Sequence, residues 1–260
     1  MFQMHKSEIH PRRVYPTPVP GLGEIIEIRE TFYNQLKILS QQNLNPISLR
    51  DEAFVRVSTF RQETYAGREK NIGKYVGTWT SAGLEFVANQ FPILRINSRL
   101  LNPELALAVT KQNRKRGYFC TPSVKEYEQS LKEANADLSK DPKDRNAVIL
   151  PLRNDFEIGL EQSEIFEAIF KDKAKEYYRL VNENISDLKS NDGKTPLVKP
   201  HRVLLVNPSE VDTYKGTLLT QISLGIPSTG SLIDGGSEIM HEKYVMRSVA
   251  RNPDLSKPFK

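Results

Sequence analysis

The chain has 260 residues, of which 38% are hydrophobic and 27% are charged, and this composition excludes an intrinsically disordered protein. Its length suits one large domain or two small ones. The formal net charge of +5 is uneven, because residues 1–120 carry 17 Lys and Arg against 10 Asp and Glu, whereas residues 121–260 carry 20 against 22.

The first predicted feature is an extended N-terminal arm over residues 1–23. This segment contains Pro11, Pro16, Pro18 and Pro20, and the last three stand at alternate positions, a pattern that holds a backbone extended. A helix is predicted next, over residues 24–42. Its apolar residues recur at spacings of three and four, which is the period of a helix face: Ile25, Ile28, Phe32, Leu36 and Leu39.

Short β-rich runs separated by turn residues follow and predict an antiparallel sheet. They lie within residues 54–60, 75–80, 84–87 and 93–96. Two helices are predicted after them. Asn102 and Pro103 favour a helix start and indicate a helix over 103–112. A single apolar stripe indicates a helix over 122–140.

The second half predicts further strands and one long helix. Strands are expected at 148–152, 156–158, 201–206 and 218–226, with a helix over 164–188. Residues 227–260 contain scattered Gly and Pro and are predicted to be an irregular tail with one short helix over 237–249.

The sequence thus predicts an α+β protein. Its sheet is expected to be mostly antiparallel or mixed, with several amphipathic helices, an extended N-terminal arm and an irregular C-terminal tail. The predicted organisation is an arm over 1–23, a body over 24–226 and a tail over 227–260. A division of the body near residue 120 is an alternative.

No catalytic residue, metal site or cofactor is predicted. The segment 225–230 has the glycine spacing of a phosphate-binding loop but lacks its lysine, and neither a dinucleotide-binding glycine motif nor a nucleophile elbow occurs. The single cysteine, Cys120, excludes a thiolate zinc cluster and an internal disulfide. Because the chain starts without an apolar leader and has no long apolar run, we expect a cytoplasmic protein with no membrane partner.

The clearest local charge feature is a run of cations followed by two aromatic residues. Cations for phosphates beside rings for base stacking are typical of a nucleic-acid contact. Arginines in the predicted arm could extend the same surface. The alternative is a solvated helix C-terminus, where cations suit the helix dipole. The candidate nucleic-acid-binding residues are Lys111, Arg114, Lys115, Arg116, Tyr118 and Phe119, with Arg12 and Arg13 in the arm.

We expect a non-enzymatic structural or assembly component of a larger intracellular or virion-like complex. An arm without a core of its own gains order by lying on another surface, so the expected partners are copies of the chain or other protein subunits. A basic half beside a mildly acidic half fits head-to-tail contact between copies, a polyanion partner, or a random imbalance of surface charge. The alternatives are a nucleic-acid-binding protein or ribonucleoprotein subunit that uses the basic N-terminal half, and an enzyme whose active-site residues are scattered along the sequence.

Overall fold

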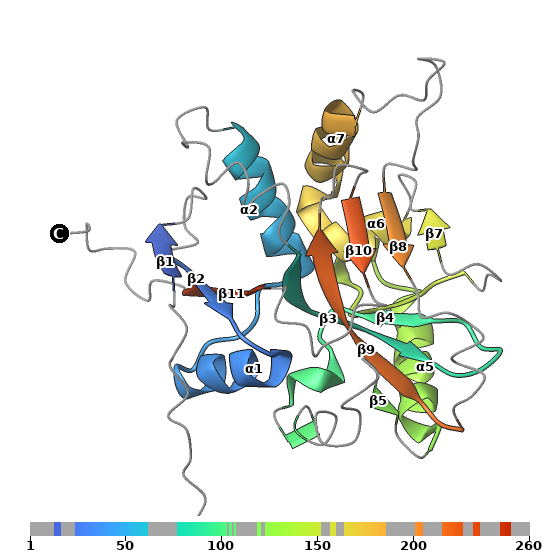
Figure 1. Ribbon diagram of the computed structural model, residues 1–260. Helices are drawn as coiled ribbons and strands as arrows, with labels where there is room; N and C mark the ends of the chain where they lie inside the picture. The colour runs from blue at the N-terminus through green and yellow to red at the C-terminus, as the bar shows by residue number, and fades with distance from the viewer. Residues whose placement is uncertain are drawn as a thin grey trace, which may run out of the picture.

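The computed structural model describes residues 13–16, 24–61, 77–102, 104–105, 107, 119–120, 123–151, 157–159, 164–185, 201–204, 215–225, 231–234 and 245–250. These residues form an α+β fold in which helices lie on both faces of one mixed sheet (Figure 1). In its first half the chain forms β1 (Arg13–Pro16), β2 (Glu24–Arg29), α1 (Phe32–Gln41), α2 (Leu49–Arg61), β3 (Thr78–Phe86), β4 (Ile93–Arg95), the 3-10 turn η1 (Arg99–Leu101) and β5 (Phe119–Cys120).

The second half completes the sheet and supplies the remaining helices. In chain order it contains α5 (Lys125–Asp137), the 3-10 turn η2 (Pro142–Asp144), β6 (Ala147–Ile149), β7 (Glu157–Gly159), α6 (Glu164–Phe170), the 3-10 turn η3 (Lys171–Lys173), α7 (Ala174–Ile185), β8 (His201–Leu204), β9 (Leu218–Gly225), β10 (Ser231–Asp234) and β11 (Val245–Ala250).

The sheet is mixed, as predicted, and is mostly antiparallel. Its described strands follow the order β1-β2-β11-β3-β9-β10-β8-β7, and β4, β5 and β6 branch from this path. The pairs β11–β3 and β10–β8 are parallel, whereas the other pairs are antiparallel. The strands come from both sides of residue 120, so a single sheet spans both halves of the chain.

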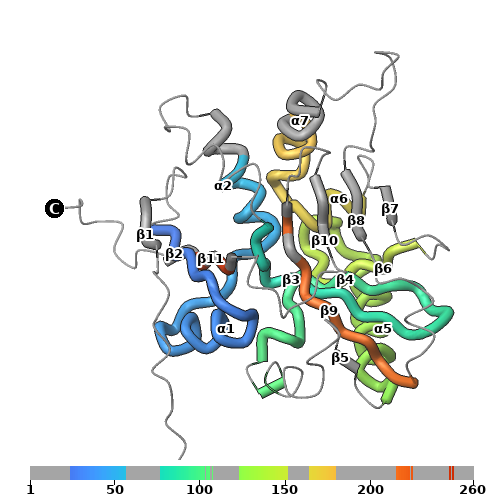
Figure 2. Tube along the Cα trace, viewed as in Figure 1, coloured from blue at the N-terminus to red at the C-terminus, as the bar shows by residue number. Residues whose placement is uncertain are grey.

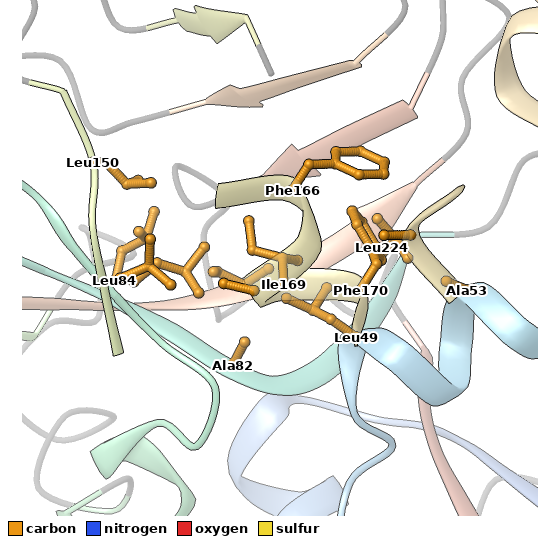
Figure 3. Close-up of a cluster of buried hydrophobic side chains, with 14 of the residues drawn as sticks. Leu49, Ala53, Ala82, Leu84, Leu150, Phe166, Ile169, Phe170 and Leu224 are labelled. Carbon is orange, nitrogen blue, oxygen red and sulfur yellow. The ribbon is translucent and has the colours of Figure 1, made fainter. Parts of the chain in front are cut away.

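The two faces of the sheet carry different helices. On one face, α2, α6 and α7 pack over β3, β4 and β9, and Figure 3 shows the side chains that meet there. On the other face, α1 packs over β2 and β3, and α5 packs over β4 and β6 (Figure 2). The adjacent residues Leu218 and Leu219 of β9 lie in different cores, as the alternation of a strand requires.

The prediction of a helix over 24–42 is wrong for residues 24–29, which form β2. The β-branched side chains of Ile25, Ile26 and Ile28 favour a strand, and all three are buried. Ile25 packs with α2 residues on one face, whereas Ile26 packs with α1 residues on the other. The helix α1 begins only after Thr31, so a strand buried on both faces produced the helix-like spacing.

The strand predicted within 54–60 is also wrong, because these residues belong to α2. The hydroxyl of Ser48 accepts a hydrogen bond from the Asp51 amide at 3.0 Å, and its Oγ lies 2.9 Å from the Asp51 carboxylate. This is a capping arrangement of the Ser-x-x-Asp type, which was visible in the sequence at Ser48–Asp51. The capped helix overrides the β propensity of the Phe and Val residues that follow.

The long helix predicted over 164–188 is interrupted at η3 and ends earlier. Lys171 has a φ of 55°, in the left-handed region, so it breaks the helix between α6 and α7. Its ammonium donates a hydrogen bond to the Arg145 carbonyl at 2.5 Å. Burial lowers the pKa of Lys171. The break turns α7 so that Tyr177 packs on Phe166 and Phe170.

Both terminal predictions need correction. Residues 13–16 pair with β2 and therefore belong to the sheet, although the predicted extended backbone is confirmed for them. The predicted irregular tail contains β10 and β11, and β11 occupies part of the segment where a helix was predicted over 237–249. Neighbouring strands on both sides of β11 supply its hydrogen bonds, which a local reading of the sequence cannot detect.

Several other predictions are confirmed. The helix predicted over 122–140 is α5, and the strands predicted at 148–152, 156–158, 201–206 and 218–226 correspond to β6, β7, β8 and β9. The runs at 75–80 and 84–87 belong to one long strand, β3, within its described range. Within the described part of the chain, no helix combines the length and apolar character needed to cross a membrane.

Candidate functional site

The predicted nucleic-acid residues fall mostly outside the described residues. Arg12, Lys111, Arg114, Lys115, Arg116 and Tyr118 all do so. Arg13 lies in β1, where its backbone is opposite Glu27 of β2. Phe119 lies in β5, opposite Leu219 of β9. The structure therefore describes two of these residues by backbone position alone, at different strands of the sheet, and nucleic-acid binding by the cluster stays a prediction.

The edge of the sheet at β1 is the first candidate interaction site. β1 lies at one end of the strand order, and its backbone pairs with β2 (Figure 1). Its four residues pair in antiparallel register, from Arg13 opposite Glu27 to Pro16 opposite Glu24. On the other side of β2 lies β11, which pairs with six residues of β2. The N-terminal and C-terminal segments of the described chain thus meet on a single strand.

The strand β2 is unusual because both of its faces are buried. Its four central residues, 25–28, are all at most 3% exposed, while Glu24 at one end is exposed. The isoleucines contact α2 on one side of the sheet and α1 on the other. A strand in this position needs partners along both edges, since buried backbone N–H and C=O groups without hydrogen bonds are costly.

A buried carboxylate marks the register of this edge. Glu27 is 1% exposed, and its Oε1 lies 3.7 Å from Nε of Arg29. The register places Arg13 of β1 opposite Glu27 on one side and Arg247 of β11 opposite Glu27 on the other. Opposite charges at directly opposed positions stabilise strand pairing. By backbone position, an acidic residue thus lies between two basic ones at this edge.

The second candidate site is a charge network between β3, β4 and α5. Arg99 donates to the Glu85 carboxylate at 3.1 Å and to the Ser130 hydroxyl at 2.8 Å. Arg95 donates to the same hydroxyl at 3.1 Å and to Glu133 at 2.6 Å. The Arg95 Nε also lies 3.8 Å from Glu85.

This network is balanced in charge, with two arginines facing two glutamates. Glu85 is 2% exposed, whereas the side chain of Glu133 is 41% exposed. Because each guanidinium already faces a carboxylate, no excess charge is left to attract an anion. Its clearest effect is to hold α5 on the sheet, since Ser130 and Glu133 belong to the helix and the arginines lie on or beside β4. No sequence motif signals it, because Glu85 and Glu133 are far apart in the chain.

The two glutamates of the network are perturbed in opposite directions. Burial raises the pKa of the Glu85 carboxyl, and it outweighs the hydrogen bond from Ser130 and the charges of Arg99 and Arg95. Hydrogen bonds from Gln129 and Arg95 lower the pKa of Glu133. With a raised pKa the folded protein binds more protons than the unfolded chain, so the contribution of Glu85 to stability falls as pH rises above the unfolded pKa. For Glu133, whose pKa is lowered, the contribution to stability is present above the unfolded pKa and is lost as the pH falls through the folded pKa.

These opposite signs give a testable pair of variants. We expect the difference in unfolding free energy between the native protein and Glu85→Gln to shrink as the pH rises from about 4 to about 7. The same difference for Glu133→Gln should grow over that range. Urea denaturation at several pH values measures both. If the two differences change in the same direction, the assigned pKa directions are wrong.

A metal centre has no support among the described residues. Their His, Cys, Asp and Glu side chains include no group of three or more that could hold a metal ion. The carboxylate of Asp137 has a structural role instead, because it accepts hydrogen bonds from the amides of Asn146 and Ala147 at 2.7 and 3.2 Å. Burial opposes its charge, but the hydrogen bonds from Lys140 and these amides outweigh that effect and lower its pKa.

Comparison with known proteins gives no family for this chain. No family model matches it, and no curated protein matches its sequence. A solved structure described as "Accommodation of massive sequence variation in Nanoarchaeota by the C-type lectin fold" is similar over 92% of this chain and 98% of that chain, with 11% sequence identity and a TM-score of 0.47. A likeness at this level carries no argument about function.

Proposed function

We propose that this protein is a non-enzymatic structural component that assembles with copies of itself or with other protein subunits. The observation that carries the proposal is the β1 edge, where a short terminal strand covers a β2 strand that is buried on both faces. Main-chain pairing at a sheet edge is a common way for chains to associate. The single cysteine fits a cytoplasmic assembly, since reduced thiols are the rule in that compartment.

The charge distribution supports the same proposal. The basic first 120 residues and the mildly acidic remainder would attract each other between copies in a head-to-tail contact. Such an attraction weakens with added salt, because surface charges are screened beyond about 8 Å at physiological ionic strength.

Two N-terminal deletions test this function. Removing residues 1–12 leaves β1 in place, whereas removing residues 1–20 deletes it. We expect the shorter deletion to retain the native mass of the assembled full-length protein and the longer one to lower it. We expect both to remain folded because the described core clusters consist of residues that follow Glu24. Native mass spectrometry and light scattering measure the mass, and thermal melting reports the fold. A full-length protein that stays monomeric at high concentration contradicts the proposal.

The alternative function, nucleic-acid binding, is tested by the same measurement with single-stranded RNA or DNA added at low salt. It rests on the run of Lys111, Arg114, Lys115 and Arg116 in the sequence. Assembly without nucleic acid supports the structural component, whereas a mass that rises only with nucleic acid, and falls steeply with salt, supports the alternative.

A further inference from the structure

A second edge of the sheet lies at β6, where a side chain of the same chain covers part of it. β6 pairs with β4, and within the described part of the chain no other strand pairs with it (Figure 2). We infer that Asp137 is a guard residue, whose carboxylate closes the outer edge of β6 to strand pairing with a second copy of this chain. This role goes beyond the proposed function and does not depend on it, since it concerns a different edge of the sheet.

The pairing of β6 with β4 determines which backbone groups of β6 face outward. Just after the strand, the amide of Leu150 donates to the Pro92 carbonyl at 2.8 Å. Just before the strand, the carbonyl of Asn146 accepts a hydrogen bond from the Ile96 amide at 2.9 Å. In an antiparallel ladder, alternate residues direct their N–H and C=O groups to opposite sides. The even-numbered residue of β6 therefore faces β4, and the two odd-numbered residues present their backbone groups at the outer edge.

The carboxylate of Asp137 occupies the start of this outer edge. Ala147 is the first odd-numbered residue of β6, and its amide donates to Oδ2 of Asp137 at 3.2 Å. The same oxygen accepts a hydrogen bond from the Asn146 amide at 2.7 Å, and Oδ1 pairs with the Lys140 ammonium at 2.5 Å. Both carboxylate oxygens therefore have partners, and Asp137 is buried. An incoming strand would find the outward amide of Ala147 already bonded.

The charges at this position oppose pairing with another strand. Charged side chains at a sheet edge, lysine above all, are a known protection against edge-to-edge association, and the Lys140 side chain is half-exposed beside Asp137. A strand that displaced the carboxylate would leave a buried charge without its two amide donors. Asp137 is also the last residue of α5, where the helix dipole disfavours a negative charge. The amides at the start of β6 therefore hold it there.

Without the carboxylate, the outer edge of β6 matches the same edge of a second copy. Ala147 and Ile149 stand two residues apart and face the same side. In an antiparallel pairing about a two-fold axis at Val148, Ala147 of each copy lies opposite Ile149 of the other copy. Each of these opposed pairs can exchange two hydrogen bonds. The pairing needs the amide that Asp137 holds, so the carboxylate and a second copy compete for the same donor.

The native mass of two variants of the full-length chain tests the inference. Asp137→Ala opens the edge, and we expect its native mass at high concentration to rise to about twice that of the unchanged protein. Lys140→Ala is the matched control, because it removes the same ion pair but leaves the carboxylate on the β6 amides, so its mass should not change. Native mass spectrometry and light scattering measure the mass, and thermal melting shows whether each variant is folded.

A double variant separates edge pairing from association caused by lost stability. Ile149→Pro removes an outward amide that the pairing of β6 with β4 does not use. Added to Asp137→Ala, it should further lower stability, so association caused by instability should increase. Association through the β6 edge should instead be lost. A folded Asp137→Ala protein that keeps the mass of the unchanged protein overturns the inference. A double variant that associates as strongly as Asp137→Ala also overturns it.

Amide hydrogen exchange tests the same edge in the unchanged protein, so the inference can fail even if a variant does not fold. We expect the Ala147 amide to exchange slowly, because Asp137 accepts its hydrogen bond. The Ile149 amide faces the same edge beyond the carboxylate, and it should exchange on the order of ten-fold faster. Equal protection of the two amides would mean that another group covers the edge, and Asp137 would not be its guard.

Discussion

Replacing Gly83 with alanine is expected to lower the free energy of unfolding by about 3 kcal/mol, because the added methyl group overpacks a closed site. Gly83 lies in β3 opposite Gln221 of β9. A Cβ atom there would lie 2.7 Å from Cβ of Ser98 and 2.9 Å from the Thr220 carbonyl oxygen, and it would also meet the Ser98 hydroxyl. The carbonyl belongs to the paired strand, so it cannot move without disturbing the β3–β9 ladder. Urea denaturation measures the loss.

A second substitution identifies the cause of this loss. Ser98→Gly removes both Ser98 atoms that the new methyl group would meet. By itself it should cost only roughly a few tenths of a kcal/mol, because Gly replaces a Ser whose hydroxyl accepts a hydrogen bond from the Leu100 amide at 3.1 Å. The double variant should lose less unfolding free energy than the sum of the two single-variant losses, since the added methyl group no longer overlaps with Ser98. Strictly additive losses would contradict the steric explanation.

The second large effect is expected at Arg56, whose guanidinium is completely buried. Its Nε lies 2.8 Å from the Glu52 carboxylate, and its Nη2 donates to the Leu224 carbonyl at 2.8 Å and to the Thr78 hydroxyl at 3.3 Å. Arg56 therefore ties α2 to β3 and β9. Replacement by Met should cost about 3–5 kcal/mol, because the buried carboxylate of Glu52 loses its guanidinium partner.

Two variants serve as controls for Arg56→Met. Arg50 lies on the same helix and pairs with Asp172 at 2.6 Å, but the two side chains are 37% and 51% exposed. Arg50→Met should therefore cost only about 0–1 kcal/mol. Adding Glu52→Gln to Arg56→Met removes the buried charge and should restore part of the stability. If Arg50→Met and Arg56→Met cost the same, burial of the pair does not control its contribution.

The helices and strands were predicted well where one residue pattern dominated. In α5 a single apolar stripe defined the helix, and in β9 alternating residues defined the strand. The errors arose where tertiary contacts determine the secondary structure of a segment. At β2, burial on both faces placed isoleucines at spacings that also fit a helix, and at β11 the strand depends on partners far away in the chain.

The candidate sites could be predicted only in part. The extended backbone near Arg13 was predicted from its prolines, but the pairing with β2 was not, since register is a property of two strands. The network of Glu85, Arg95 and Arg99 joins residues from separate elements and follows no spacing rule. A sequence pattern reports neighbours along one element, whereas these sites depend on the packing of several.

The bulge in β3 would have been equally hard to foresee. Between Trp79 and Gly83 the register with β9 shifts, so β3 contains residues that have no partner in the ladder. The side-chain amide of Gln221 donates hydrogen bonds to the backbone carbonyls of Thr80 and Ala82 at 2.5 and 2.7 Å. The backbone amide of Ser81 donates to the Ile47 carbonyl at 2.8 Å. Side chains and a neighbouring segment thus replace the hydrogen bonds that the ladder lacks.

The pairing of β2 with β11 also sets the order in which the chain can fold during synthesis. Glu24 pairs with Ala250, so almost the whole chain separates these two partners. A ribosome adds about 5–20 residues per second, so β2 waits on the order of ten seconds or more for β11 to emerge. Through that interval its isoleucines have β1, α1 and α2 available but not β11. The nascent chain therefore leaves the β11-facing edge of β2 unpaired until β11 has emerged, and an unpaired strand edge of this kind is prone to aggregation.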